Sequence, residues 1–140
     1  MAELSRAAIV ALAVVGAVVV NLVVYAVGRA AGGTFRFTAA GGPAEVDAVT
    51  VAAFSALPLL VGLTAVALLA PRAGWVVPAA SVVGPALAVL TIVVMTLPTD
   101  LDATSKTTLA LCHLTLVPIV VVAVTALGRR TRVVAGRVAT

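Results

Sequence analysis

Four long apolar runs alternate with short polar segments along the chain, and they cover residues 7–27, 46–70, 76–97 and 107–127. A helix of about 20 residues, rising about 1.5 Å per residue, crosses the ~30 Å hydrocarbon layer of a membrane. Each run is long enough for one crossing. The pattern therefore predicts an all-α membrane protein, a four-transmembrane-helix antiparallel bundle that forms a single domain over residues 1–140, with a basic tail at 128–140.

The first and fourth runs each carry a feature that bears on how their helices begin or end. No charge interrupts the fourth run, and Gly128 followed by Arg129 and Arg130 is expected to end its helix. The first run follows Arg6 and loosely fits a secretory signal peptide. It is longer than the ~7–15-residue apolar region of such peptides and contains Asn21, so we interpret it as an uncleaved helix.

The first outer loop contains a short extended segment. Residues 34–38 (TFRFT) alternate as a strand does, and this alternation puts Phe35 and Phe37 on one face. We favour a position of both rings at the lipid headgroup level, in an aromatic belt; a lid folded over the mouth of the bundle is the alternative. Glu45 and Asp47 precede the second helix and are predicted to stabilise its N-terminus.

Composition and charge add a class and an orientation. The chain is 63% hydrophobic and 10% charged, whereas soluble domains average about 25% charged residues, so a soluble domain is excluded. Arg29, Arg36 and Lys106 fall on one side of the predicted membrane. Six basic residues fall on the other side, namely Arg6, Arg72, Arg129, Arg130, Arg132 and Arg137. An excess of Lys and Arg marks the cytoplasmic side, so we predict a plasma-membrane protein with both termini in the cytoplasm.

The basic tail also predicts partners. Beside the lipid bilayer itself, we expect anionic lipid headgroups, at about 1 kcal/mol per basic residue, on Arg129, Arg130, Arg132 and Arg137. No nucleic-acid partner is expected, because the basic residues lie at the ends of apolar runs, as topology signals do. In the last connection, Asp100 and Asp102 are expected to form a solvated turn or a helix cap.

Polar side chains inside the spans form the candidate site. Asn21 and His113 each lie about six residues, or ~9 Å, below the outer end of their helix, and Tyr25 shares a face with Asn21. An unsatisfied amide or imidazole costs several kcal/mol in hydrocarbon, so we predict a direct Asn21–His113 contact inside the bundle. The full set for a polar pocket or for interhelical hydrogen bonds is Asn21, Tyr25, Asp47, Thr50, Ser55, Thr91, Thr96 and His113.

Two interpretations of His113 stay open. The favoured one is a neutral imidazole that holds helices together by bonding to Asn21 or to a threonine. The alternative is a proton or ligand site that opens outward, since histidine titrates near neutrality. Cys112 and His113 are adjacent, so they point about 100° apart on a helix, and we expect no metal site. Cys112 is expected to be a small apolar filler.

Proline and small residues are expected to shape the helices and their packing. Three prolines interrupt predicted helices and are expected to kink them, namely Pro58, Pro85 and Pro118. Small residues recur at every fourth position of the third helix, at Ala80, Gly84 and Ala88. Such faces favour close helix packing, and we interpret them as contact surfaces for a homo-oligomer or for a membrane-protein partner.

Three short motifs resemble those of a known family, namely Asn21-x-x-x-Tyr25, Phe54-x-x-x-Pro58 and Cys112-His113-Leu114. The family comprises small uncharacterised four-helix membrane proteins of high-GC Gram-positive bacteria, filed as a domain of unknown function. The resemblance covers nearly the whole chain. It implies the fold and the membrane location, and it brings no catalytic role with it.

The function predicted from the sequence is not enzymatic. The chain has no CxxC, HExxH, GxSxG or glycine-rich phosphate loop, and we expect no cofactor. We predict a structural or accessory membrane protein. The alternative is a small transporter or sensor, whose outward-facing pocket around Asn21, Tyr25 and His113 binds a proton or a small ligand.

Overall fold

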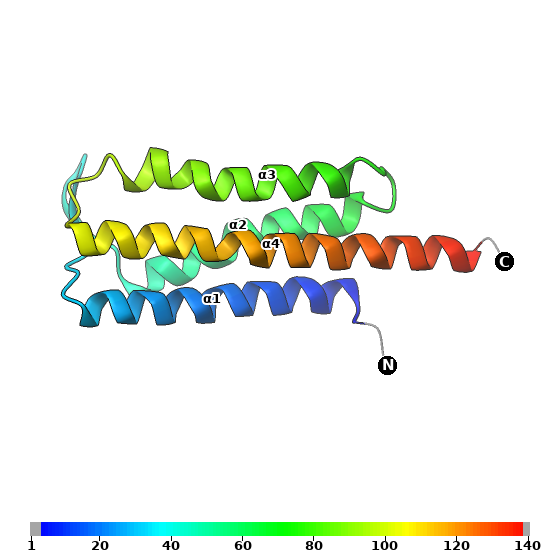
Figure 1. The fold of residues 1–140 in the computed structure, drawn as a ribbon, viewed down its shortest axis with the longest axis horizontal. Coiled ribbons are helices and arrows are strands. Elements are labelled where there is room, and N and C mark those ends of the chain that lie inside the picture. The colour runs from blue at the N-terminus through cyan, green and yellow to red at the C-terminus, as the bar shows by residue number, and fades with distance from the viewer. Residues whose placement is uncertain (1–3, 139–140) are drawn as a thin grey trace.

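The computed structural model describes residues 4–138, and the side chains of residues 4–131. Its helices are α1 (Arg6–Ala30), α2 (Ala48–Leu69), α3 (Val76–Thr91), continued by the π-helical segment η1 (Ile92–Thr96), and α4 (Ala103–Val138). They lie side by side as an antiparallel bundle (Figure 1). All four are long and apolar enough to cross a membrane, which confirms the predicted fold class.

Polar side chains at the helix starts explain where three of the helices begin. Ser5 accepts a hydrogen bond from the Ala8 amide (3.1 Å), and Asp47 accepts one from the Thr50 amide (2.7 Å). Asp102 does the same for Ser105 at the start of α4 (2.8 Å). Each bond satisfies an amide that has no partner within its helix. The helix-stabilising roles predicted for Asp47 and Asp102 are therefore present.

Glu45 does not stabilise the N-terminus of α2 as predicted. Its carboxylate instead forms an ion pair with Arg29 (2.9 Å) and a longer one with Arg36 (3.5 Å). The reason is that residue 45 closes a strand of the hairpin, which turns the side chain back toward the end of α1.

Helix α4 does not end at Gly128, and this prediction was wrong. The helix continues to Val138, so residues 128–138 are helical. A glycine inside a helix costs only about 1 kcal/mol relative to alanine. Here it allows close packing, because a Cβ at buried Gly128 would stand 3.0 Å from Cγ1 of Val77 on α3.

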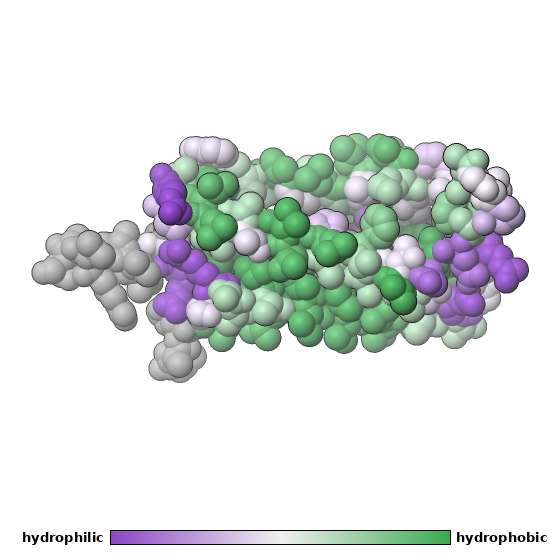
Figure 2. Space-filling model, turned by 180° about the vertical axis from the view of Figure 1, so that it is seen from behind, coloured by the Kyte–Doolittle hydropathy of each residue, from purple (hydrophilic) through white to green (hydrophobic). Residues whose placement is uncertain are grey.

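The packing of the bundle is uneven. Helix α1 packs against α2 and α4, and α3 packs against α4, whereas α2 and α3 make few contacts with each other. Small residues bring helices close within the chain: a Cβ at Gly84 of α3 would lie 2.6 Å from Cγ1 of Val120 on α4. The core of the bundle includes Ala17, Leu63, Val124 and Leu127. Figure 2 shows apolar surface along the middle of the molecule and polar residues gathered at both ends.

A short hairpin covers one end of the bundle, opposite the start of α1 (Figure 1). Strands β1 (Arg36–Ala39) and β2 (Gly42–Glu45) pair antiparallel, with Arg36 opposite Glu45 and Ala39 opposite Gly42. Gly42 has φ +117°, a conformation that glycine adopts without steric cost.

Phe35 does not lie in an aromatic belt, so the favoured prediction, which placed both rings at the headgroup level, was wrong for Phe35. Phe35 precedes β1 with a left-handed φ of 56° and is 0% exposed. Its ring centroid lies 4.6 Å from that of Tyr25, and the guanidinium of Arg29 lies 5.9 Å from it. Phe37 is half-buried. The positive φ breaks the strand alternation, so Phe35 plugs the bundle end and the lid interpretation describes the loop better.

Candidate functional site

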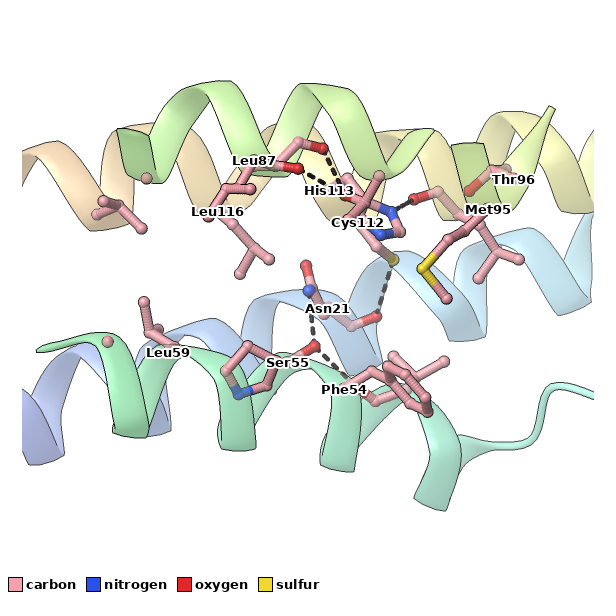
Figure 3. Close-up of a pocket in the computed structure, with 18 of the residues that line it drawn as sticks. Asn21, Phe54, Ser55, Leu59, Leu87, Met95, Thr96, Cys112, His113 and Leu116 are labelled. Atoms are coloured by element: carbon pink, nitrogen blue, oxygen red, sulfur yellow. Dashed lines mark hydrogen bonds between the residues drawn. The ribbon is translucent and has the colours of Figure 1, made fainter. Parts of the chain in front are cut away.

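A cavity of about 640 Å³ lies between the helices. Figure 3 shows lining residues from every helix of the bundle: Asn21 of α1, Phe54, Ser55 and Leu59 of α2, Leu87 of α3, Met95 and Thr96 of η1, and Cys112, His113 and Leu116 of α4. Most of the lining side chains are apolar. Cavities of this size and character bind small apolar ligands that a few polar groups orient.

The cavity opens sideways, between α2 and α3. Residues on both helices line the cavity and are also exposed on the outside of the bundle, among them Phe54 (65% exposed) on α2 and Leu87 (54% exposed) on α3. The few contacts between these two helices leave the gap. In a membrane this side of the bundle faces acyl chains rather than water.

The hairpin closes the cavity at the end of the bundle. Phe37, Glu45 and Val46 line it there. The hairpin is tied to the connection before α4, because Asp102 Oδ2 accepts hydrogen bonds from both the amide (3.0 Å) and the hydroxyl (2.7 Å) of Thr34.

Further hydrogen bonds hold the hairpin to the same connection. Asp100 accepts from the amide (2.8 Å) and the hydroxyl (2.7 Å) of Thr38, and the Phe35 amide donates to Ser105 Oγ (2.9 Å). Hydrogen bonds from Ser105 and Thr34 hold the pKa of Asp102 far below its usual value, and bonds from Thr38 lower the pKa of Asp100. Both carboxylates therefore stay ionised and bonded at neutral pH.

Asn21 joins three helices at the wall of the cavity. It is 1% exposed, and its Nδ2 donates to Ser55 Oγ of α2 (2.8 Å). Its Oδ1 accepts from the hydroxyl of Thr115 on α4. The amide is thus satisfied within the protein, as burial in an apolar region requires.

His113 faces the cavity with one ring nitrogen bound and the other open. Nδ1 lies 2.8 Å from the carbonyl oxygen of Leu109, one turn earlier on α4. A carbonyl only accepts, so Nδ1 is the protonated donor. None of the hydrogen bonds among the described residues uses Nε2. The predicted Asn21–His113 hydrogen bond is not formed, because Ser55 and Thr115 take both ends of the amide.

Comparison with known proteins gives a family without a function. A family described as being of unknown function, DUF6069, matches residues 2–133. The chain belongs to the DUF6069 family. This confirms the predicted membership of a domain of unknown function, and it transfers no role to any residue of the DUF6069 chain. No curated protein and no solved structure matches the chain.

Within the DUF6069 chain, the structure brings together some predicted site residues and separates others. Asn21, Thr50, Ser55, Pro58, Thr91, Thr96 and His113 line the cavity. Tyr25 does not, because its hydroxyl donates to the carbonyl of Val46 (3.1 Å) beneath the hairpin. Pro85 and Pro118 lie within α3 and α4.

The predicted lipid-contact arginines are only partly described. Arg129 and Arg130 lie near the end of α4 that is opposite the hairpin, and Arg130 Nε donates to the carbonyl of Leu4 (2.6 Å). The side chains of Arg132 and Arg137 lie outside the described residues.

Several hydrogen bonds around the cavity and the hairpin of the DUF6069 chain involve residues that the sequence did not single out. Thr115 holds Asn21, and Thr34, Thr38 and Ser105 bind the loop carboxylates or the hairpin backbone. Each pair is separated by more than 60 residues, and hydroxyl residues are common in both loops. Among the described residues, no group of three or more His, Cys, Asp and Glu side chains is placed to hold a metal ion.

Proposed function

We propose that this DUF6069 protein is a non-enzymatic accessory protein of the plasma membrane that binds a chain-like apolar molecule taken from the bilayer. The observation that carries the proposal is the cavity of about 640 Å³ with its opening between α2 and α3. A molecule reaches such an opening through the lipid rather than through water.

The shape of the cavity supports an elongated ligand. On α2 the lining runs from Thr50 to Val66, and on α4 from Leu109 to Val124. Sixteen residues of helix span ~24 Å, which is most of the ~30 Å hydrocarbon layer. An extended hydrocarbon chain lying along the helices matches this length.

The same geometry argues against a water-filled pocket that opens outward, which was one alternative for the function. The hairpin covers that end of the bundle, and the Asn21 amide is occupied by Ser55 and Thr115. Binding from the bilayer agrees better with the lining, in which apolar side chains predominate.

The proposed topology places the hairpin outside the cell and both termini in the cytoplasm. It rests on the concentration of Arg6, Arg72, Arg129 and Arg130 at the ends of the helices opposite the hairpin. We also expect anionic lipid at this end, because Arg129 and Arg130 border a groove whose walls include the apolar residue Val122. Fusing alkaline phosphatase or a fluorescent protein to the C-terminus tests the topology: only the fluorescent fusion should be active.

A matched pair of glycine substitutions tests the binding function. Gly62 lines the cavity and Gly16 does not, and at both positions an added Cβ meets nothing within 4 Å. Leucine is a better helix former than glycine at either site, so neither variant should lose the fold. Gly62→Leu places its side chain in the cavity, whereas Gly16→Leu leaves the cavity unchanged.

The binding assay uses tritiated hexadecan-1-ol and purified protein held on scintillant beads in detergent. The wild type and Gly16→Leu should retain the alcohol equally, and Gly62→Leu should bind it about tenfold more weakly, because its side chain competes for the same space. Equal retention by the two variants, or no retention by the wild type, would refute the binding function.

A further inference from the structure

The open nitrogen of His113 restricts the chemistry of the ligand. We infer that the molecule bound in the cavity is an uncharged single-chain amphiphile whose headgroup hydroxyl donates a hydrogen bond to Nε2 of His113. This inference rests on the proposed binding function and adds the chemical class of the ligand and its direction in the cavity.

The hydrogen bond at Nδ1 defines what Nε2 can do. Nδ1 donates to the carbonyl of Leu109, and this bond fixes both the tautomer and the ring orientation. In the neutral ring Nε2 then carries a lone pair and no proton, so it accepts hydrogen bonds and does not donate them. A ligand that uses this nitrogen must bring a donor.

The polar groups nearest to His113 along the helices are already used. The Cys112 thiol points to the carbonyl of Asn21 (3.7 Å), and the Thr91 hydroxyl bonds to the carbonyls of Leu87 and Ala88 (3.0 and 2.8 Å). Figure 3 shows the imidazole of His113 beside Cys112, facing the space that α2, η1 and α4 enclose. The hydroxyls of Thr50 and Thr96 line the cavity nearer to the hairpin.

The depth of His113 disfavours a charged headgroup. It lies ten residues after Ala103, which places it ~15 Å along α4 from the hairpin end. Among the described residues that line the cavity, Glu45 is the one with a charged side chain; it lies at the hairpin and is paired with Arg29. A phosphate or carboxylate beside His113 would therefore meet no fixed positive charge, and its burial in the apolar cavity would cost several kcal/mol.

The rest of the cavity fits the chain of such a molecule. Beyond His113 the lining continues through Leu116 and Val120 to Val124 on α4, opposite Leu63 and Val66 on α2. Eleven residues of α4 span ~16 Å, about the depth of one leaflet of the hydrocarbon layer. The headgroup thus lies on the hairpin side, and the chain runs toward the arginine-rich end.

The test uses the fact that His113 is the one histidine of the chain. Protein labelled with ¹⁵N-histidine in nanodiscs gives a single pair of imidazole nitrogen signals. Hexadecan-1-ol is compared with 1-methoxyhexadecane, which has nearly the same shape and no donor. The alcohol should shift the Nε2 signal toward that of a protonated nitrogen while the Nδ1 signal stays in place, and the ether should leave both signals unchanged.

Competition against tritiated hexadecan-1-ol separates the possible failures. The alcohol should bind about fivefold tighter than the ether, the difference expected for one hydrogen bond, and His113→Phe should abolish this preference. If the two compounds bind equally and Nε2 does not respond, the headgroup inference is wrong while the binding function stands. If neither compound binds the wild type, the proposed function itself fails.

Discussion

Replacing Asn21 tests whether one buried amide holds three helices together. Its side chain bonds to Ser55 of α2 and to Thr115 of α4. Interhelical hydrogen bonds in membrane proteins contribute about 0.6 kcal/mol on average and about 1.7 kcal/mol at most. Two such bonds and the loss of a fully buried side chain give an expected destabilisation of about 2 kcal/mol for Asn21→Ala.

The partners of Asn21 keep other acceptors, and this limits the loss. The Ser55 hydroxyl still donates to the Val51 carbonyl (2.7 Å), and the Thr115 hydroxyl to the Cys112 carbonyl (2.8 Å). Neither hydroxyl is left unpaired, so the cost of a stranded buried donor does not arise. Asn21→Leu, which restores volume without polarity, should therefore lose no more than about 1 kcal/mol.

Double-mutant cycles in mixed-micelle unfolding measure the bonds separately. The cycles of Asn21 with Ser55 and with Thr115, each residue changed to alanine, should show coupling energies of about 0.6–1.7 kcal/mol. The cycle of Asn21 with His113 serves as the control and should be additive within about 0.3 kcal/mol, because no hydrogen bond joins them. A control coupling larger than either of the others would refute the assignment of Asn21 to Ser55 and Thr115.

Three further predictions concern the hairpin end of the bundle. The pKa of Asp102 is lower in the folded protein than in the unfolded chain, so its stabilising contribution is present above the unfolded pKa and is lost as the pH falls through the folded pKa. Hydrogen exchange of the Thr34 and Phe35 amides should therefore accelerate in strong acid, and in the Asp102→Asn variant the same amides should exchange fast already at neutral pH. Gly28→Ala should destabilise by about 1–3 kcal/mol in thermal unfolding, because its Cβ would overlap Thr108 Oγ1, whereas Gly16→Ala, with open space around the new Cβ, should stabilise by about 0.5–1 kcal/mol. Phe35→Ala should lower the free energy of unfolding by about 3–5 kcal/mol, and an unchanged melting temperature would show that the plug does not hold the bundle end.

The spans and the inward position of Asn21 followed from the sequence because both depend on solvation alone. Twenty apolar residues must cross the bilayer, and a buried amide must find partners. The choice of partner did not follow. Helix α2 is apolar nearly all round, so nothing in its sequence fixes which way Ser55 faces. That rotation is set by packing, which also decided that α4 continues through Gly128.

Part of the cavity wall is formed by a π-helical segment that the local sequence does not predict. The π-helical segment at Ile92–Thr96 is defined by a hydrogen bond from the Leu97 amide to the Ile92 carbonyl (2.9 Å). Such wide turns insert one residue into a helix, and no proline or glycine within the segment marks this one. Met95 and Thr96 both lie in this segment and line the cavity. A regular helix, in contrast, was the natural expectation from the apolar run.

The bonds that fasten the hairpin impose an order on biosynthesis. Thr38 and Asp100 are 62 positions apart, Thr34 and Asp102 are 68, and Phe35 and Ser105 are 70. During translation the first loop is made before Asp100, Asp102 and Ser105, so it cannot form these hydrogen bonds until α2 and α3 have also been synthesised. Sealing of this end is consequently among the last steps of assembly, and a chain arrested before α4 would leave its aromatic plug open to proteases and to other nascent proteins.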